Sequence, residues 1–128
     1  MNYHFSKFVD YSFGKTLERV AEELKEEGFG ILTEIDVKET LKKKINVDIK
    51  PYKILGACNP HFAYKALSAE NKIGTMLPCN VVVQMHDDGK VEVSAVDPVA
   101  SMQAVENDNL REVAAEVREK LKRVINNI

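Results

Sequence analysis

Residues 79–95 read CNVVVQMHDDGKVEVSA and contain the clearest structural signal in the chain. The run 81–85 is rich in β-branched residues, which favour strands, and residues 91–95 alternate between apolar and polar, as a half-buried strand does. Asp88-Gly89 lies between the runs, and Asp-Gly is typical of the type I′ turn of a tight hairpin because both central residues of that turn need positive φ. The stretch therefore predicts two antiparallel strands.

The other elements are predicted around this hairpin from apolar periodicity and capping residues. Strands are expected near residues 2–9, 29–35 and 52–58, and helices over 12–28, 36–45, from 60 to before 74, over 99–105 and over 107–125. Because the hairpin is the one clear strand pair, the pattern favours an α+β domain with a mostly antiparallel sheet of about five strands backed by helices. The arrangement predicts that helices cover one face of the sheet.

The partners are predicted from the uncovered face and from the net charge. A sheet of this kind leaves its other face or an edge available, and pairing two copies is the commonest way to bury such a surface, so we expect a homodimer. The formal charge is −2, with 18 basic and 20 acidic residues. Nucleic-acid binding relies on neutralising phosphates, so no nucleic-acid partner is expected.

The length and the amino terminus indicate one domain over residues 1–128 and a cytoplasmic location. A chain of 128 residues with 45% hydrophobic and 30% charged residues has the size and composition of an ordinary globular domain. The sequence begins MNYHFSK, without the basic start and apolar run of a signal peptide. It has no apolar stretch of the roughly 20 residues that span a bilayer. We therefore expect a soluble, unexported protein without membrane contact.

The candidate chemistry lies between Cys58 and Cys79. Cys58 is predicted at the end of a strand, directly before Asn59 caps a helix that begins at Pro60, and the positive end of a helix dipole favours a thiolate. His61 follows in the first turn, so Cys58 and His61 form a C-x-x-H pair. If the strand beginning at Cys79 neighbours the one ending at Cys58, the three side chains form a soft ligand set. Such a set suits Zn or Cu(I).

Two other interpretations of the cysteines remain open. Buried cysteines often act as small apolar groups, which makes an inert structural or interaction domain an alternative. The second alternative is thiol chemistry, either a reversible disulfide between Cys58 and Cys79 or sulfur transfer through a persulfide-like intermediate on the more exposed sulfur. The sequence assigns no enzyme activity, and a metal or a small molecule stays open as the ligand.

Other polar residues have simpler explanations. His86 is expected in a solvated turn, and Lys42, Lys43 and Lys44 on a solvated helix face. Asp97 precedes Pro98, so capping a helix already explains it, although it could serve as an acid or base if it lies at the same edge as the thiols. No common nucleotide-binding, hydrolase or zinc-protease motif is present.

Several strings together resemble one family. They are GFGIL at 28–32, ILGACNP at 54–60, LPCNV at 77–81 and Asp97-Pro98 followed by Met102. The chain resembles the domain of unknown function 302 family over nearly its whole length. The resemblance implies a small α+β fold similar to the TATA-binding-protein-like class, commonly seen as homodimers, and it implies no established activity. Its motif residues here are Cys58, Asn59, Pro60, Leu77, Pro78, Cys79, Asn80, Asp97 and Pro98.

Overall fold

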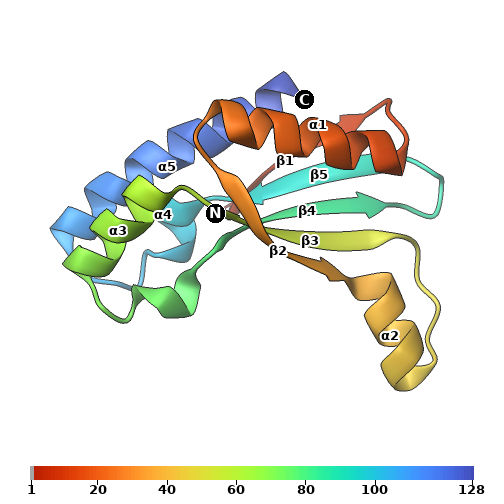
Figure 1. Cartoon of the computed structure of the whole chain (residues 1–128), viewed down its shortest axis with the longest axis horizontal. Coiled ribbons are helices and arrows are strands. Elements are labelled where there is room, and N and C mark those ends of the chain that lie inside the picture. Colours follow the sequence, from red (N-terminus) through yellow and green to blue (C-terminus); the bar gives the residue numbers. More distant parts are fainter. Residues whose placement is uncertain (1) are drawn as a thin grey trace.

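The computed structural model describes residues 2–128, which form a five-stranded sheet with helices (Figure 1). The strands are β1 (His4–Val9), β2 (Gly30–Asp36), β3 (Tyr52–Cys58), β4 (Cys79–Met85) and β5 (Val91–Val96). The helices are α1 (Phe13–Glu26), α2 (Val37–Ile45), α3 (Pro60–Ala69), α4 (Pro98–Ser101) and α5 (Asp108–Asn127), with a 3-10 turn at Ile73–Met76. The predicted α+β class is confirmed, and all five strands were anticipated.

The sheet has the order β1-β5-β4-β3-β2, and every neighbouring pair is antiparallel. The predicted hairpin is confirmed, with Met85 opposite Val91. The predicted type I′ turn is wrong, because among the loop residues only Gly89 has a positive φ, of 86°. The five-residue loop instead contains a hydrogen bond of 2.9 Å from Gly89 N to His86 O. Gly89 is its only residue in a left-handed backbone conformation.

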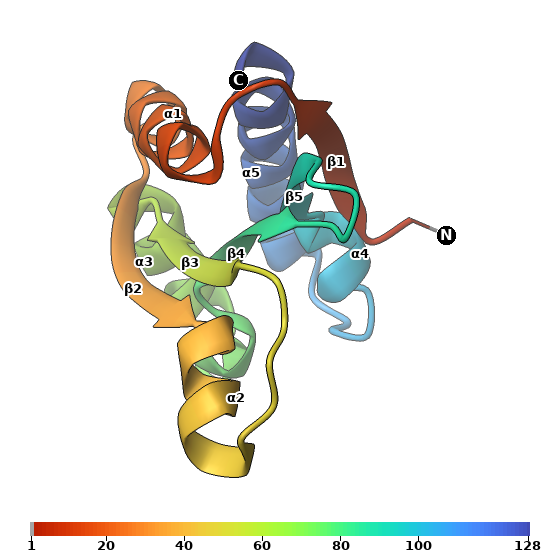
Figure 2. The same ribbon diagram turned by 90° about the vertical axis from the view of Figure 1, so that its right-hand side faces the viewer.

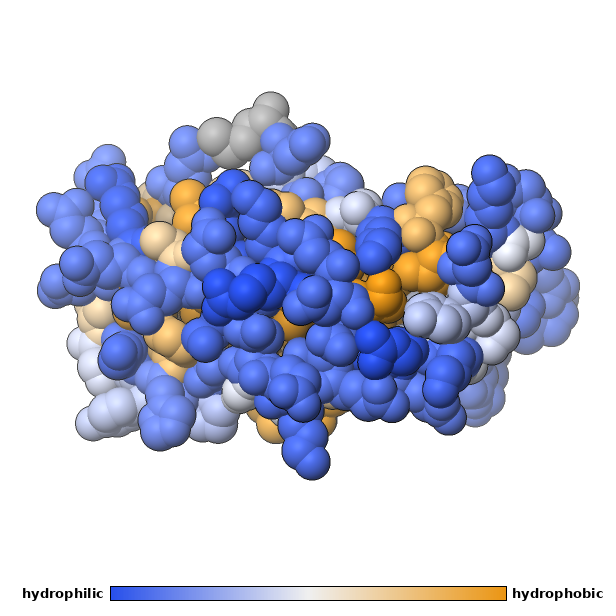
Figure 3. Space-filling model, turned by 90° about the horizontal axis from the view of Figure 1, so that it is seen from above, coloured by the Kyte–Doolittle hydropathy of each residue, from blue (hydrophilic) through white to orange (hydrophobic). Residues whose placement is uncertain are grey.

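Helices α1 and α5 cover one face of the sheet, and the core lies between these two helices and the sheet (Figures 1 and 2). Its centre is made of wholly buried aliphatic side chains from the sheet and from both helices, namely Val20, Leu24, Val81, Val83, Val93, Leu121 and Val124. Seen from the helix side, the outer surface is mostly hydrophilic (Figure 3). This half of the molecule therefore has the buried and exposed faces that amphipathic periodicity predicts.

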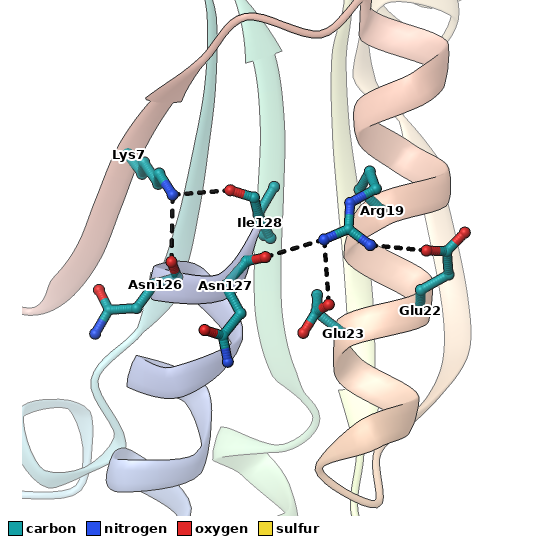
Figure 4. Close-up of polar contacts among 7 residues, drawn as sticks. All are labelled: Lys7, Arg19, Glu22, Glu23, Asn126, Asn127 and Ile128. Atoms are coloured by element: carbon teal, nitrogen blue, oxygen red, sulfur yellow. Dashed lines mark hydrogen bonds and ion pairs between the residues drawn. The ribbon is translucent and has the colours of Figure 1, made fainter.

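Two basic side chains bind the carbonyl end of α5 (Figure 4). Lys7 Nζ donates to the carbonyl oxygens of Ile128 at 2.8 Å and Asn126 at 3.3 Å. Arg19 donates to the carbonyl oxygen of Asn127 at 3.0 Å. The last carbonyls of a helix lack partners within the helix and carry partial negative charge, so cations are stabilising there. Lys7, which breaks the apolar alternation of β1, thus has a structural role.

Strand β2 departs from its predicted alternation. Ile31 lies opposite Ala57, whereas Thr33 lies opposite Gly56, so a bulge separates Ile31 from Thr33. A bulge adds one residue to one strand and shifts the following side chains to the other face. Ile31 therefore lies on the face opposite Thr33 and Ile35, whereas uninterrupted alternation over residues 29–35 would place all three on one face.

Helix α2 follows β2 directly and lies on the side of the sheet opposite α1, away from the core (Figures 1 and 2). Asp36 caps it by accepting a hydrogen bond from Glu39 N at 3.0 Å, as predicted. None of its residues is buried. Within residues 2–128, no helix is both long enough and apolar enough to cross a membrane.

Candidate functional site: two thiols at the ends of neighbouring strands

The two cysteines lie at the same end of the neighbouring strands β3 and β4. Strand β3 ends at Cys58, strand β4 begins at Cys79, and Ala57 lies directly opposite Cys79. Opposite Cα atoms of an antiparallel pair are about 4.5–5.5 Å apart, and one residue along the strand adds about 3.3 Å. The Cα atoms of Cys58 and Cys79 are thus expected about 6 Å apart. Successive side chains of a strand alternate faces, so the register places Ala57 rather than Cys58 on the same face as Cys79.

Both cysteines line a small cavity of about 40 Å³ between the end of the sheet and the helices. Its walls come from β3, β4, α3, α4 and α5, and almost all of its other lining side chains are apolar, among them Phe29, Phe62, Pro98, Met102, Val113 and Val117. A site for a drug-sized molecule occupies about 300–1,000 Å³. The cavity therefore has room for a few atoms beside the sulfurs and none for a larger ligand between sheet and helices.

The two thiols have different surroundings. Cys79 is buried, with 8% of its surface exposed, whereas Cys58 is half-buried, and both are free thiols. Burial raises the pKa of the Cys79 thiol to about 11, with a smaller contribution from the charge of Cys58 nearby. Cys79 is therefore protonated at neutral pH. Cys58 is the thiol that solvent and small reagents reach first.

Asn59 takes the N-cap position of α3, but its side chain makes no capping hydrogen bond. The amide Nδ2 instead donates to the carbonyl oxygen of Glu27 at 3.3 Å, at the turn that ends α1. The predicted capping role of its side chain is wrong, because this contact turns the amide away from the helix. Asn59 is 8% exposed, and its Oδ1 is the one buried side-chain oxygen or nitrogen without a hydrogen-bond partner in the described chain. Asn59 also lines the cavity.

Glycine is required at position 56 by close packing of β3 against β2 and Pro78. A Cβ atom on Gly56 would collide with Thr33 Oγ1 and lie 2.7 Å from a ring carbon of Pro78. Gly28 is constrained as well, with a φ of 85° and a position for a Cβ atom 3.0 Å from Asn59 Nδ2. The strings at 54–60 and 77–81 thus interlock physically, which explains why they contain glycine and proline at these positions.

His61 does not join the thiols. It is exposed on α3 and does not line the cavity. Among residues 2–128, no three histidine, cysteine or acidic side chains lie close enough together to hold a metal ion. Of the three predicted ligands, Cys58 and Cys79 line the same cavity, and His61 lies outside it.

Asp97 lies near the cavity as a structural residue. Its Oδ1 accepts from Val99 N at 3.0 Å, which confirms the predicted cap of α4, and its Oδ2 accepts from Arg118 of α5 at 3.2 Å. The sequence analysis missed Arg118, since nothing in the spacing of α5 marks that position. Pro98 lines the cavity, whereas Asn80 is exposed and lines a separate groove on the uncovered face of the sheet.

The fold and the cavity define a class of protein: an α+β domain with an antiparallel sheet, helices α1 and α5 on one of its faces, and two cysteines at the same end of neighbouring strands. The model of the domain of unknown function DUF302 matches residues 5–128, and the chain belongs to this family. A crystal structure of an uncharacterized conserved DUF302 protein from Bacillus stearothermophilus is 30% identical, with a TM-score of 0.92, over 99% of this chain and 98% of that one. No curated protein matches.

Proposed function

We propose that this protein is a thiol–disulfide redox protein in which Cys58 and Cys79 form a reversible disulfide. The observation that supports the proposal is the unequal pair in one cavity, with a half-buried thiol at a helix start beside a buried thiol of raised pKa. This difference in exposure gives the two thiols different roles. Cys58 reacts with the external disulfide, and Cys79 is shielded from it and reacts only with the mixed disulfide on Cys58.

The chemistry takes a small external disulfide, R–S–S–R, as the oxidant. The Cys58 thiolate attacks one of its sulfurs, so a Cys58–S–S–R bond forms, the external S–S bond breaks, and R–S⁻ leaves and takes up a proton. Cys79 then gives up its proton and attacks Cys58 Sγ, which forms the Cys58–Cys79 bond and expels the second R–S⁻. The protein loses two electrons and two protons, and the external disulfide gains them as two thiols.

The surroundings of the thiols favour this order of events. Cys58 lies two residues before Pro60, where α3 begins, and the amino-terminal end of a helix carries partial positive charge that stabilises negative charge on nearby sulfurs in the transition state. Cys79 cannot compete for the external disulfide, because burial both shields it and keeps it protonated. The cavity leaves space for the sulfurs to change rotamer as they approach one another.

A soft metal held by Cys58 and Cys79 is the alternative that the two converging thiols allow, because thiolates select ions such as Cu(I). It needs no third ligand from His61, which lies outside the cavity. Metal binding and disulfide formation use the same sulfurs, so one experiment separates them.

The experiment is oxidation of the reduced protein by glutathione disulfide, followed by intact mass spectrometry of samples purified without chelator. We expect the wild type to lose about 2 Da, the mass of the two thiol hydrogens. The Cys79→Ser variant should stop at a mixed disulfide on Cys58. The Cys58→Ser variant should react far more slowly, because its remaining thiol is buried.

The same experiment has three outcomes that contradict the proposal. A wild type that gains one glutathione and retains it would show that Cys79 does not resolve the intermediate. A stoichiometric metal that protects both thiols from oxidation would assign the site to metal binding instead. Unchanged mass after prolonged treatment would identify both cysteines as inert packing.

A further inference from the structure

We infer that the groove on the uncovered face of the sheet binds a small neutral sugar, a molecule that presents hydroxyl groups around an apolar ring face. The groove lies on the side of the sheet turned away from α1 and α5 (Figure 2). Because it is separate from the thiol cavity, this binding site does not depend on the proposed redox function. Its size, its polar side chains and their charge point to this ligand.

The groove has the size of a small-molecule site. Its volume is about 360 Å³, within the range of about 300–1,000 Å³ that such sites occupy. Residues of β1, β3, β4 and β5 line it, and Val82 and Val96 give it apolar surface. One sugar ring can therefore lie in the groove in contact with apolar side chains.

Strand register brings polar side chains of four strands together in the groove. Gln84 of β4 lies opposite Glu92 of β5 and, on its other side, opposite Tyr52 of β3. Two residues along β5 from Glu92, Ser94 lies opposite Ser6 of β1. Neighbouring strands are about 4.8 Å apart, and alternate residues of one strand about 6.6 Å apart. Several of these side chains can therefore contact one small molecule at the same time.

Hydrogen bonds within the chain hold part of this polar set in place. Ser6 Oγ lies 2.6 Å from His4 Nδ1 and 2.7 Å from Ser94 Oγ, which links the three side chains in a row. Glu92 Oε1 lies 2.9 Å from His86 Nε2, so the carboxylate is fixed while its Oε2 atom remains an acceptor. Side chains held in this way lose little rotamer freedom when a ligand binds, which favours affinity.

Asn80 and Gln84 supply the groups that are free to bind a ligand. Both line the groove, and neither takes part in a side-chain hydrogen bond within residues 2–128. A side-chain amide offers two donor hydrogens and an acceptor oxygen, and the hydroxyl groups of a sugar both accept and donate. Tyr3 and Tyr52 also line the groove. Their aromatic rings add apolar surface for the C–H face of a sugar ring, and each ends in a hydroxyl group.

The charge of the groove favours a neutral ligand. Among residues 2–128, no lysine or arginine lines it. Phosphate and carboxylate groups are recognised chiefly by these two cations, so nucleotides and sugar phosphates find no counter-ion here. The carboxylate of Glu92 is already paired with His86, so a cationic ligand would have to compete with that contact. A neutral molecule with several hydroxyl groups has neither cost.

The first test is a titration of the isotope-labelled full chain with glucose, galactose and mannose, followed by NMR. The side-chain amide signals of Asn80 and Gln84 should shift and reach saturation with at least one of these sugars, whereas the amide signal of Asn59 in the thiol cavity should not move. The phosphate ester of the sugar that binds should bind no more tightly, because the groove has no cation for it. Adenosine serves as a competing neutral ring compound.

The second test removes one free amide. Gln84→Ala should raise the dissociation constant of the sugar about threefold to tenfold, the weight of one hydrogen bond. Gln103→Ala is the matched control, because Gln103 is exposed after α4 and does not line the groove, so the affinity should stay unchanged. Circular dichroism checks that both variants remain folded.

Four outcomes overturn the inference. Amide signals that no neutral sugar moves would show that the groove does not bind this class. A phosphate ester that binds more tightly than its sugar, or shifts produced by adenosine alone, would assign the groove to another ligand. Shifts that follow protein concentration instead of sugar would show that a second copy covers the groove. Equal affinity of wild type and Gln84→Ala would place the sugar elsewhere.

Discussion

The raised pKa of Cys79 makes the stability of the reduced protein depend on pH in the alkaline range. Burial raises this pKa from 9.0 to about 11, so the folded protein retains the Cys79 proton at pH values where the unfolded chain has lost it. The stabilisation is complete below pH 9, the value in the unfolded chain, and declines as the pH rises toward 11. Stability therefore falls between these two values.

The size of the effect follows from the two pKa values. One pKa unit corresponds to about 1.4 kcal/mol, so ionisation of Cys79 costs about 3 kcal/mol in total. Between about pH 8 and about pH 10.5 the expected loss is about 2 kcal/mol, because the folded protein is still largely protonated at the upper value. The Cys79→Ala variant has no thiol at this position and should not show this loss.

Urea denaturation under reducing conditions measures the prediction. Lysine and tyrosine side chains titrate in the same range, so the informative quantity is the difference between wild type and Cys79→Ala at each pH. At about pH 8 this difference reports the lost packing of the sulfur, and at about pH 10.5 it should be smaller by about 2 kcal/mol. A difference that stays constant with pH would refute the buried, protonated state of Cys79.

Four further substitutions test contacts that hold the strands and helices in place. Gly56→Ala should lower the free energy of unfolding by about 3 kcal/mol or prevent folding, since the added Cβ collides with Thr33; thermal denaturation would show this, and a neutral result would contradict the close packing. Asp97→Asn should retain the cap of α4 and lose the ion pair with Arg118, whereas Asp97→Ala loses both. Calorimetry should therefore find Asp97→Ala less stable than Asp97→Asn by about 1 kcal/mol. Lys7→Met should cost about 0.5–1 kcal/mol in urea by removing the cation from the end of α5, and equal stability would argue against that role.

The sequence predicted the sheet and the position of the thiols because both depend on local signals. The apolar stripe of α5 and the alternation in β5 each fix which face is buried. The end of β3 and the start of β4 are marked by Cys58-Asn59-Pro60 and Pro78-Cys79, so the adjacency of these strands places both cysteines at one end of the sheet. The structure confirms that adjacency.

The predictions that failed depended on contacts between segments far apart in the sequence. Asn59 is directed by the carbonyl of Glu27, 32 residues away, rather than by its own helix. His61 lies on the exposed face of α3, because Phe62 and Ala66 form the face that lines the cavity. The bulge in β2 adds a residue that no periodic pattern contains. None of these three features has a local sequence signal that distinguishes it from the predicted alternative.

Peptide mapping tests directly whether Cys58 and Cys79 bond to each other. Trypsin cleaves after Lys53 and Lys65 and after Lys72 and Lys90, which places the two cysteines in separate peptides, residues 54–65 and 73–90. The protein is oxidised by glutathione disulfide, and the fraction without a disulfide between chains is digested without reductant. The digest should yield these peptides joined by a disulfide, and reduction should release them. Separate peptides that each carry glutathione would contradict the account.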